Sequence, residues 1–233
     1  MAASANPNEP AWQFGFMAAL TPSAREAVLQ LGRRRTYATG ESVFYEGDPS
    51  VFAVVVLAGR LKVSSTSEDG HDTVLAFRGP GDLIGELSLF DGSPRPATVA
   101  AVEPAEVVLI TADRFTELVR TRPEIAEVLL RTVVGKLRDA DRQRLEFGAY
   151  DTTGRVARRL VQLADEHGVP GSTATGGVRI TLPLSQTELA GWTGSSREAV
   201  ARALALLRRR RLITTHRRSI VVLDVDALRS QAG

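Results

Sequence analysis

The hydrophobic and polar positions along the chain change their pattern between the first half and the second. Between residues 37 and 110, short apolar runs of β type are separated by glycine and other turn residues, which is typical of short strands. The runs are Phe52–Gly59, Arg60–Thr66, Asp72–Gly79 and Glu106–Ala112. Strands this short and this closely spaced predict a compact antiparallel barrel or sandwich. Before them, Pro22–Leu31 carries apolar residues at helical spacing and predicts a short helix.

A long helix is predicted from residue 124 to residue 147, because Pro123 suits the first turn of a helix and no further proline interrupts the segment. At 1.5 Å per residue its length is ~36 Å. The first half has one apolar seam, made of Ile125, Leu129, Val133 and Leu137. Since a long helix with one apolar seam usually packs on a partner, we expect a homodimer through residues 124–147. The alternative is a helix that packs only within its own chain.

The C-terminal third begins with a predicted hinge at residues 150–155. Asp151 or Thr152 caps a new helix there, and this helix runs to about His167. A loop rich in glycine, serine and threonine then follows, from residue 168 to residue 177. This organisation places a hinge, a helix and a loop between the long helix and the last part of the chain.

Two short helices joined by a tight turn are predicted next. Ser185 and Glu188 form a Ser-x-x-Glu capping box that starts a helix to about Thr193. Gly194 supplies a turn in which positive φ costs little, and Ser195–Glu198 repeat the capping pattern. Helices joined by so short a turn cross steeply, which is the helix-turn-helix arrangement.

The second of these helices is amphipathic. Its apolar face consists of Val200, Ala203, Leu204 and Leu207. Arg197, Glu198 and Arg202 lie on the opposite arc, within the first two turns. Arginine pairs bidentately with guanine and glutamate accepts from cytosine N4, so we expect these three residues to read bases in the major groove of double-stranded DNA. The alternative is a salt-bridged helical hairpin on a soluble domain.

Groups suited to DNA phosphates surround this helix. Leu212–Thr215 and Ser219–Val222 predict a β-hairpin that turns at residues 216–218, in the manner of a wing. The expected contacts to the DNA backbone are Ser185, Ser196, Arg208, Arg209, Arg217 and Arg218, and Arg210 and Arg211 add further charge.

Charge is segregated in the same direction. Residues 1–150 carry a net charge of −4, whereas residues 151–233 carry +6. A basic C-terminal region indicates a polyanionic partner. A generic arginine-rich surface is the alternative, because charge alone does not name the partner.

Composition argues against several other kinds of protein. The absence of cysteine excludes disulfides, iron–sulfur clusters held by cysteine and thiol catalysis, and three separated histidines argue against a histidine metal site or a haem. No apolar run approaches the ~20 residues of a membrane helix, and the N-terminus lacks the features of a secretory signal. We therefore expect a cytoplasmic protein without membrane contact. Since no P-loop, nucleophile elbow or zinc-protease motif is present, we expect no enzyme activity.

Two motifs, GSSREAVAR at 194–202 and the segment Gly85–Thr98, resemble the cyclic-AMP receptor protein and fumarate–nitrate regulator (CRP/FNR) family of transcription regulators. The resemblance covers nearly the whole chain after about residue 15. It implies an α+β fold with an N-terminal cyclic-nucleotide-binding β-roll (a jelly-roll-like barrel), a long dimerisation helix and a C-terminal winged helix-turn-helix. The implied division is a disordered tail at 1–14, a sensor domain at 15–122, the dimerisation helix at 123–149 and the DNA-binding domain at 150–233.

The resemblance also implies roles for single residues. In the family's phosphate-binding cassette a glutamate holds the ribose 2′-hydroxyl and an arginine holds the cyclic phosphate, and these roles carry over to Glu86 and Arg95. The remaining expected nucleotide-binding residues are Gly85, Leu87, Pro96, Ala97 and Asp141. The family further implies a dimer that reads an inverted-repeat DNA site and acts with RNA polymerase as an activator, although the residues themselves do not distinguish activation from repression.

Two departures from the family pattern leave the effector open. Pro96 has no N–H to give to a phosphate, and one lost charge-assisted hydrogen bond costs ~1.5–3 kcal/mol. Ala140 and Asp141 stand where members that respond to cyclic AMP carry a polar pair, and Asp141 suits the donor edge of guanine. The effector is therefore cyclic AMP by resemblance, a guanine nucleotide (cyclic GMP or cyclic di-GMP) received by residues 138–144, or none. The alternative for residues 138–144 is an ion-paired stretch of dimer helix.

Overall fold

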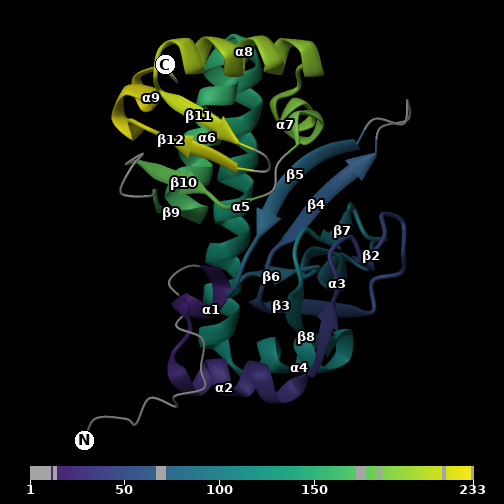
Figure 1. Cartoon of the computed structure of the whole chain (residues 1–233). Coiled ribbons are helices and arrows are strands. Elements are labelled where there is room, and N and C mark those ends of the chain that lie inside the picture. Colours follow the sequence, from purple (N-terminus) through teal and green to yellow (C-terminus); the bar gives the residue numbers. More distant parts are fainter. Residues whose placement is uncertain are drawn as a thin grey trace, which may run out of the picture. The chain divides into compact units, whose positions relative to one another are not determined.

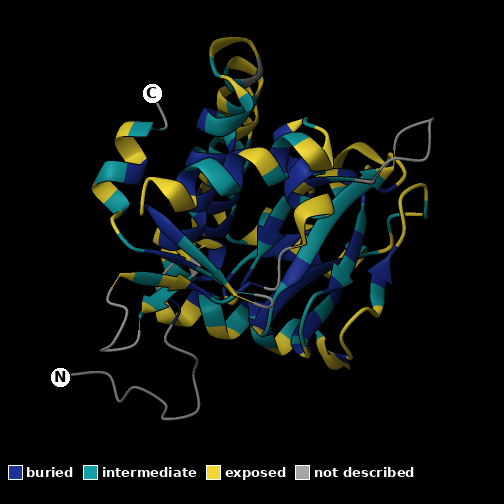
Figure 2. Cartoon of the chain, turned by 45° about the horizontal axis from the view of Figure 1, so that its top comes forward, coloured by how far each residue is buried: buried dark blue, intermediate teal, exposed yellow. Residues whose placement is uncertain are grey.

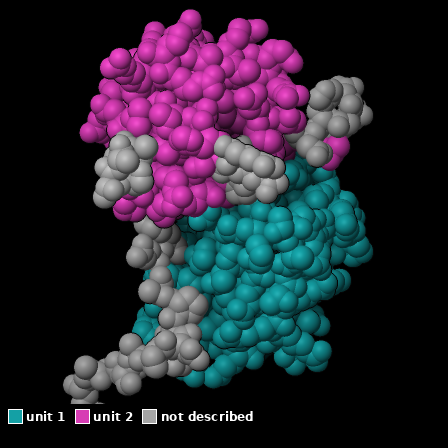
Figure 3. Space-filling model, in the orientation of Figure 1, with its two compact units in different colours: residues 1–65, 75–137 teal, residues 66–74, 138–233 magenta. Residues whose placement is uncertain are grey.

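The structure is a computed structural model whose residues fall into two compact units. It describes residues 12, 15–66, 72–171, 177–182, 185–216 and 219–231. The first unit contains residues 1–65 and 75–137, and the second contains residues 66–74 and 138–233 (Figure 3). The domain limits expected after residues 122 and 149 stay predictions. Within the described ranges, no helix is both long and apolar enough to cross a membrane.

Two four-stranded sheets, most of whose residues belong to the first unit, form the predicted β-sandwich. Their strand orders are β1-β8-β3-β6 and β2-β7-β4-β5 (Figure 1). The strands are β1 (Arg33–Tyr37), β2 (Ser42–Phe44), β3 (Phe52–Ala58), β4 (Leu61–Thr66), β5 (Asp72–Arg78), β6 (Leu83–Ile84), β7 (Thr98–Ala101) and β8 (Ala105–Thr111). β3 pairs antiparallel with both β6 and β8. The prediction of short antiparallel strands is confirmed.

Strand β3 is the centre of this unit because both of its faces are buried. In Figure 2 the strands are mostly buried or half-buried, whereas most exposed residues lie on helices and loops. Alternate residues of a strand point to opposite faces. Ala53, Val55 and Leu57 accordingly belong to the core cluster that includes residues of the helices, whereas Val54 and Val56 belong to the cluster between the strands. The phosphate-binding cassette predicted at residues 85–98 follows β6, which pairs with β3, so the candidate site is attached to the most buried part of the sheet.

The helices of the first unit are α1 (Gly15–Ala19), α2 (Pro22–Leu31), α3 (Leu87–Asp91), α4 (Ala112–Thr121) and the first part of α5 (Pro123–Ala149). Thr21 caps α2 by accepting a hydrogen bond from the Ala24 amide, 3.3 Å away. The predicted helix 22–31 is confirmed. Trp12 is buried against the same core, so the expectation of a disordered tail to residue 14 does not hold at this residue; residues 1–11, 13 and 14 lie outside the described part of the chain.

Helix α5 confirms the predicted long helix and corrects its apolar seam. Ile125 and Leu129 are 0% and 7% exposed and pack in the core of their own unit, so they are not available to a partner. Leu130 and Leu137 are instead 64% and 61% exposed. Because these two leucines are seven residues apart, they lie on one face of the helix. The predicted seam is therefore wrong at Ile125, Leu129 and Val133, which pack in the core that α1, α2 and α4 share, whereas Leu137 is exposed as the prediction requires.

The second unit surrounds helix α6 (Thr152–His167), which begins where Asp151 caps it by accepting from the Gly154 amide at 2.7 Å. Its buried face packs on α8 (Arg197–Arg209) and α9 (Val225–Gln231). A four-stranded sheet has the order β11-β12-β10-β9. Its strands are β9 (Gly168–Pro170), β10 (Val178–Ile180), β11 (Ile213–His216) and β12 (Ser219–Val222), and α7 (Gln186–Thr193) precedes α8. The predicted hairpin is confirmed, but the segment expected to be only a loop begins with a strand, β9.

Candidate nucleic-acid interface and nucleotide pocket

The start of α7 has the capping box that the sequence predicts. The Glu188 amide donates to Ser185 Oγ at 3.1 Å, and the Ser185 amide donates to Glu188 Oε2 at 2.9 Å. The helix ends at Gly194, which has the left-handed conformation (φ 56°, ψ 42°) that glycine adopts at little cost. The predicted helix-turn-helix is therefore present, with its first helix capped at both ends.

Helix α8 starts one residue later than the sequence pattern indicates. Its cap is Ser196, whose Oγ accepts from the Ala199 amide at 3.2 Å, so the prediction that Ser195 starts the helix is wrong. The physical reason is that the Ser195 amide still closes the end of α7, donating to the Ala190 carbonyl at 3.0 Å. The Ser195 hydroxyl is also engaged elsewhere, because its Oγ accepts from Arg155 Nη2 at 3.0 Å.

The buried face of α8 is the predicted one. Its buried residues are Val200, Ala203, Leu204 and Leu207. Arg197, Glu198 and Arg202 are exposed. Hydrogen bonds from its own amide and from Ser196 lower the pKa of the Glu198 carboxyl, which therefore stays ionised and acts only as an acceptor at neutral pH. Two donors and one acceptor thus face outward from one helix, as contact with base edges requires.

The expected contacts to the DNA backbone lie around these three residues. Arg208 and Arg209 are exposed at the end of α8, and Arg208 Nη1 donates to Thr215 Oγ1 of β11 at 2.8 Å. Ser185 and Ser196 are exposed at the starts of the two helices, where each serine already caps an amide. Arg217 and Arg218, expected at the tip of the wing, lie outside the residues that the structure describes.

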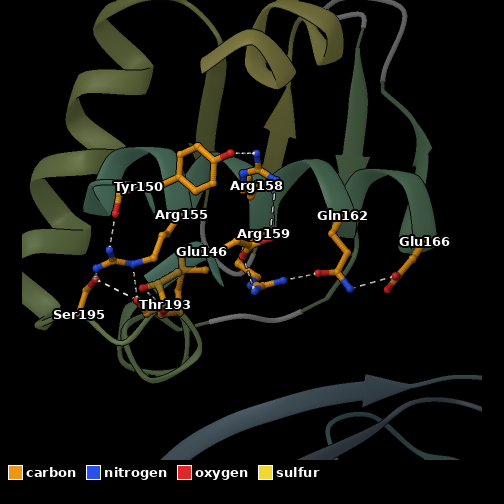
Figure 4. A network of polar contacts seen from close by, with 10 residues as sticks. Glu146, Tyr150, Arg155, Arg158, Arg159, Gln162, Glu166, Thr193 and Ser195 are labelled. Atoms are coloured by element: carbon orange, nitrogen blue, oxygen red, sulfur yellow. Dashed lines mark hydrogen bonds and ion pairs between the residues drawn. The ribbon is translucent and has the colours of Figure 1, made fainter. Parts of the chain in front are cut away.

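A single arginine joins the hinge to the turn of the helix-turn-helix (Figure 4). Arg155 donates from Nη1 to the Tyr150 carbonyl at 2.6 Å, from Nε to the Thr193 carbonyl at 2.8 Å, and from Nη2 to Ser195 Oγ at 3.0 Å. The planar guanidinium suits three directed bonds of this kind. The sequence analysis placed this residue only at the end of the predicted hinge and did not foresee these three contacts.

A buried ion pair holds the end of α5 against α6. Arg159 is 6% exposed and donates from Nη2 to Glu146 Oε2 at 2.7 Å and from Nη1 to Gln162 Oε1 at 2.7 Å (Figure 4). Its guanidinium also lies 5.3 Å from the centre of the Trp192 ring in α7. Burial lowers the pKa of Arg159 and the Glu146 charge opposes that shift. The pair therefore connects three helices of the second unit.

Residues 138–144, considered above as a receiver of guanine, contain an ion pair of their own. Arg142 pairs with Asp139 one helical turn away, and both side chains are exposed. These two residues also border a cavity of about 490 Å³ that Glu146, Arg158 and Arg159 help to line. Asp141 is exposed and does not line it. The contacts in this stretch favour the ion-paired alternative.

The first unit contains a smaller cavity, of about 120 Å³, at the phosphate-binding cassette. Six of the seven predicted nucleotide-binding residues line it, namely Gly85, Glu86, Leu87, Arg95, Pro96 and Ala97. The seventh, Asp141, belongs to the second unit. The predicted cassette residues between Gly85 and Ala97 therefore line one cavity.

Arg95 is 1% exposed and lies in the wall of this cavity. Its Nη1 donates to the Gly85 carbonyl at 2.9 Å and its Nη2 to the Phe52 carbonyl, while its guanidinium lies 4.2 Å from the centre of the Phe44 ring. Burial lowers the pKa of Arg95. Gly85 has φ +81°, and a Cβ there would come within 2.5 Å of Arg95 Nη1, so this approach requires glycine.

Glu86 is 2% exposed and its carboxylate has a cationic partner that the sequence analysis did not find. Lys136 of α5 donates from Nζ to Glu86 Oε1 at 2.7 Å and to the Leu83 carbonyl at 2.9 Å. Burial lowers the pKa of Lys136 and the Glu86 charge opposes that shift. The only signal in the sequence was that Lys136 is one of two lysines among 29 basic residues.

Two polar atoms beside the cavity are buried and unpaired. Ser88 Oγ and Arg95 Nε have no hydrogen-bond partner within the described part of the chain, and both residues line the cavity. Buried polar groups are usually hydrogen-bonded. Unused donors in one cavity wall indicate a site for a ligand that can accept hydrogen bonds.

Comparisons with known proteins match both units. The family model "Cyclic nucleotide-binding domain" matches residues 34–122, and "Crp-like helix-turn-helix domain" matches residues 154–231. The chain is 32% identical over 218 residues to the CRP-like cAMP-activated global transcriptional regulator of Mycobacterium tuberculosis H37Rv, which covers 94% of this chain and 96% of that protein. It is 31% identical over 188 residues to the cyclic AMP receptor protein of Thermus thermophilus, covering 81% and 82% of the two chains.

Solved structures give the same likeness. The c-di-GMP responsive global regulator CLP of Xanthomonas campestris has a TM-score of 0.76 and 26% identity, with 88% of this chain and 100% of that chain covered. A CRP-family transcriptional regulator of Thermus thermophilus has a TM-score of 0.72 and 27% identity, over 85% of this chain and 96% of that one. Both likenesses cover most of this chain.

Proposed function

Because the chain belongs to the CRP/FNR family of DNA-binding transcription regulators, we propose that it binds an inverted-repeat DNA site as a homodimer whose affinity is set by a cyclic nucleotide in the first unit. The observation that carries the proposal is the cavity at the cassette, which the buried side chains of Arg95 and Glu86 both line. The chain acts by binding and not by catalysis, in the cytoplasm and without membrane contact, with RNA polymerase as a further partner and activation as its expected effect.

The DNA-reading part of the proposal rests on α8. Arg197, Glu198 and Arg202 contact base edges, and the serine and arginine residues around them contact phosphates. The predicted reading helices of the dimer sit about one DNA turn, ~34 Å, apart. The exposed leucines Leu130 and Leu137 lie on one face of α5, and this supports a dimer contact along the helix.

The ligand part of the proposal is an exchange of partners. The cavity is smaller than the ~300 Å³ at the lower end of small-molecule sites, so a nucleotide must widen it. The ribose 2′-hydroxyl would take the place of Lys136 beside Glu86, and the phosphate would take Arg95 from its carbonyl partners. The ligand shifts the protein toward the DNA-binding arrangement only by binding that arrangement more tightly.

Cyclic AMP is the proposed effector. The relatives from Mycobacterium tuberculosis and Thermus thermophilus are named for cyclic AMP, which supports it. A guanine nucleotide is the second candidate, supported by the name of the Xanthomonas neighbour and by Asp141, whose carboxylate suits the guanine edge. A regulator without any ligand is the third, because Pro96 removes a phosphate donor.

Calorimetric titration of the full chain with cyclic AMP, cyclic GMP and cyclic di-GMP tests the proposal. We expect cyclic AMP to bind most tightly, and Arg95→Leu to abolish its binding. Tighter binding of either guanine nucleotide would replace the proposed effector with the second candidate. Binding of none of the three would contradict nucleotide control.

A further inference from the structure

The cassette of this chain lacks one donor at the place where an anionic ligand would be held. Pro96 follows Arg95 directly and lines the same cavity. Proline has no backbone N–H, so this position offers no hydrogen bond to the ligand. The neighbouring charge remains, since Arg95 is buried in the cavity wall. An anionic oxygen in the cavity would therefore be left with an unfilled acceptor position.

Ser88 is a donor in the same cavity that has no other use. It is 2% exposed, and its Oγ has no hydrogen-bond partner within the described part of the chain. Ser88 belongs to α3, immediately after Glu86 and Leu87, and all three line the cavity. A hydroxyl rotates to suit its partner and can donate to a charged oxygen.

A second unpaired donor supports an anionic partner. Arg95 Nε is also buried without a partner in the described part of the chain, and it belongs to a residue that lines the cavity. A phosphate oxygen can accept from both donors and carries a charge opposite to that of the arginine. A buried water molecule is the other species that could accept from Ser88.

We propose that the Ser88 hydroxyl donates to the anionic oxygen of the effector that Arg95 binds, and so replaces the backbone donor that Pro96 lacks. This inference rests on the proposed nucleotide effector. Ser88 then restores part of the affinity for the effector that the cassette loses because Pro96 has no N–H.

The proposal predicts a loss of affinity without a loss of stability. Ser88→Ala removes one hydrogen bond to a charged group, and this lowers nucleotide affinity about 10- to 100-fold. The free energy of unfolding of the ligand-free protein should not fall, because the hydroxyl has no partner in the described part of the chain. A purely structural serine would show the reverse.

A double-mutant cycle tests the replacement itself. Pro96→Ala restores a backbone N–H, so this variant should bind nucleotide more tightly than the natural chain. In the Pro96→Ala background, Ser88→Ala should cost less than about threefold, because the two donors serve one oxygen and their effects are not additive. Ser50→Ala is the matched control, since Ser50 Oγ is also buried and unpaired among the described residues but Ser50 does not line the cavity.

Calorimetric titration with cyclic AMP, cyclic GMP and cyclic di-GMP would give the nucleotide affinities, and urea unfolding without ligand would give the stabilities. Both would be measured for the natural chain, Ser88→Ala, Pro96→Ala, the double variant and the Ser50→Ala control. Natural affinity in Ser88→Ala, as a water partner predicts, or an equal loss in both backgrounds would overturn the inference and leave the proposed function standing. A comparable loss in Ser50→Ala, or destabilisation of Ser88→Ala, would also overturn it. If the natural chain binds none of the three nucleotides, both proposals fall.

Discussion

Arg197 and Arg217 carry the same charge but are expected to do different work. Arg197 is exposed in the first turn of α8. Arg217 belongs to the predicted wing, outside the described residues, and is assigned to the phosphates. Contacts to bases discriminate between sequences, whereas contacts to phosphates strengthen binding to all of them.

Replacing each arginine by alanine separates the two roles. Arg197→Ala should lose discrimination at one base position in each half-site, by ~1–3 kcal/mol. Arg217→Ala should weaken all sequences alike and flatten the dependence of affinity on salt. Affinities for a set of duplexes that differ at single positions, measured at several salt concentrations, check both. The reverse pattern would show that the reading face has been misassigned.

A titrating residue near the cassette gives a pH prediction. Asp82 accepts from the Gly79 amide at 2.9 Å, and burial raises the pKa of its carboxyl. A carboxyl whose pKa is raised in the folded state contributes stability that is present below its unfolded pKa of ~3.9 and is lost as the pH rises through the folded value. Asp82→Asn does not titrate. The natural chain should therefore lose stability relative to Asp82→Asn as the pH rises from about 4, in urea unfolding at several pH values, and a constant difference would contradict the assignment.

At the scale of helices and strands, much of the fold follows from local pattern. Residues 22–31, the long α5 and the two capped helices around Gly194 were predictable because caps, proline and apolar spacing are local signals. Strand β9 was not, since three residues at the head of a segment rich in glycine and serine are too few to show alternation, and they follow α6 directly. The α5 seam was misplaced for a related reason, because helical spacing does not say which neighbour covers a face.

The residues of the candidate site likewise fall into those that local sequence motifs predicted and those that only the fold brought together. Glu86, Arg95 and the α8 residues were found because they belong to contiguous motifs. Lys136 and Arg155 were missed because their partners lie 50 and about 40 positions away in the chain. Long-range polar contacts of this kind are visible only once the fold brings the residues together.

The pair of Glu146 and Arg159 makes a prediction at the level of packed helices. Arg159→Met leaves a carboxylate without its buried partner and should cost about 3–5 kcal/mol of unfolding free energy, whereas adding Glu146→Gln should recover part of that loss. Urea unfolding in a Trp12→Phe background reports the second unit, because Trp192 is then the sole tryptophan. A loss below about 1 kcal/mol for Arg159→Met would show that the pair does not hold the helices.

For the whole molecule, the charge distribution and the two family-model matches divide the chain in a similar way. The net charge of +6 on residues 151–233 belongs with the helix-turn-helix, and the net charge of −4 on residues 1–150 belongs mainly with the sensor. Most of the electrostatic attraction to DNA is therefore expected from the C-terminal part of the chain. The proposed control by nucleotide therefore predicts different DNA affinities for the protein with and without bound nucleotide.

The most direct test of this control measures DNA affinity with and without nucleotide. Fluorescence anisotropy with an inverted-repeat duplex, selected from a random pool by the full chain, would give both constants at one fixed salt concentration. We expect saturating cyclic AMP to tighten binding at least tenfold in the natural chain and not in Arg95→Leu, which should keep the natural ligand-free affinity. Equal affinity with and without each of the three nucleotides would contradict nucleotide control and leave a DNA-binding regulator without a ligand.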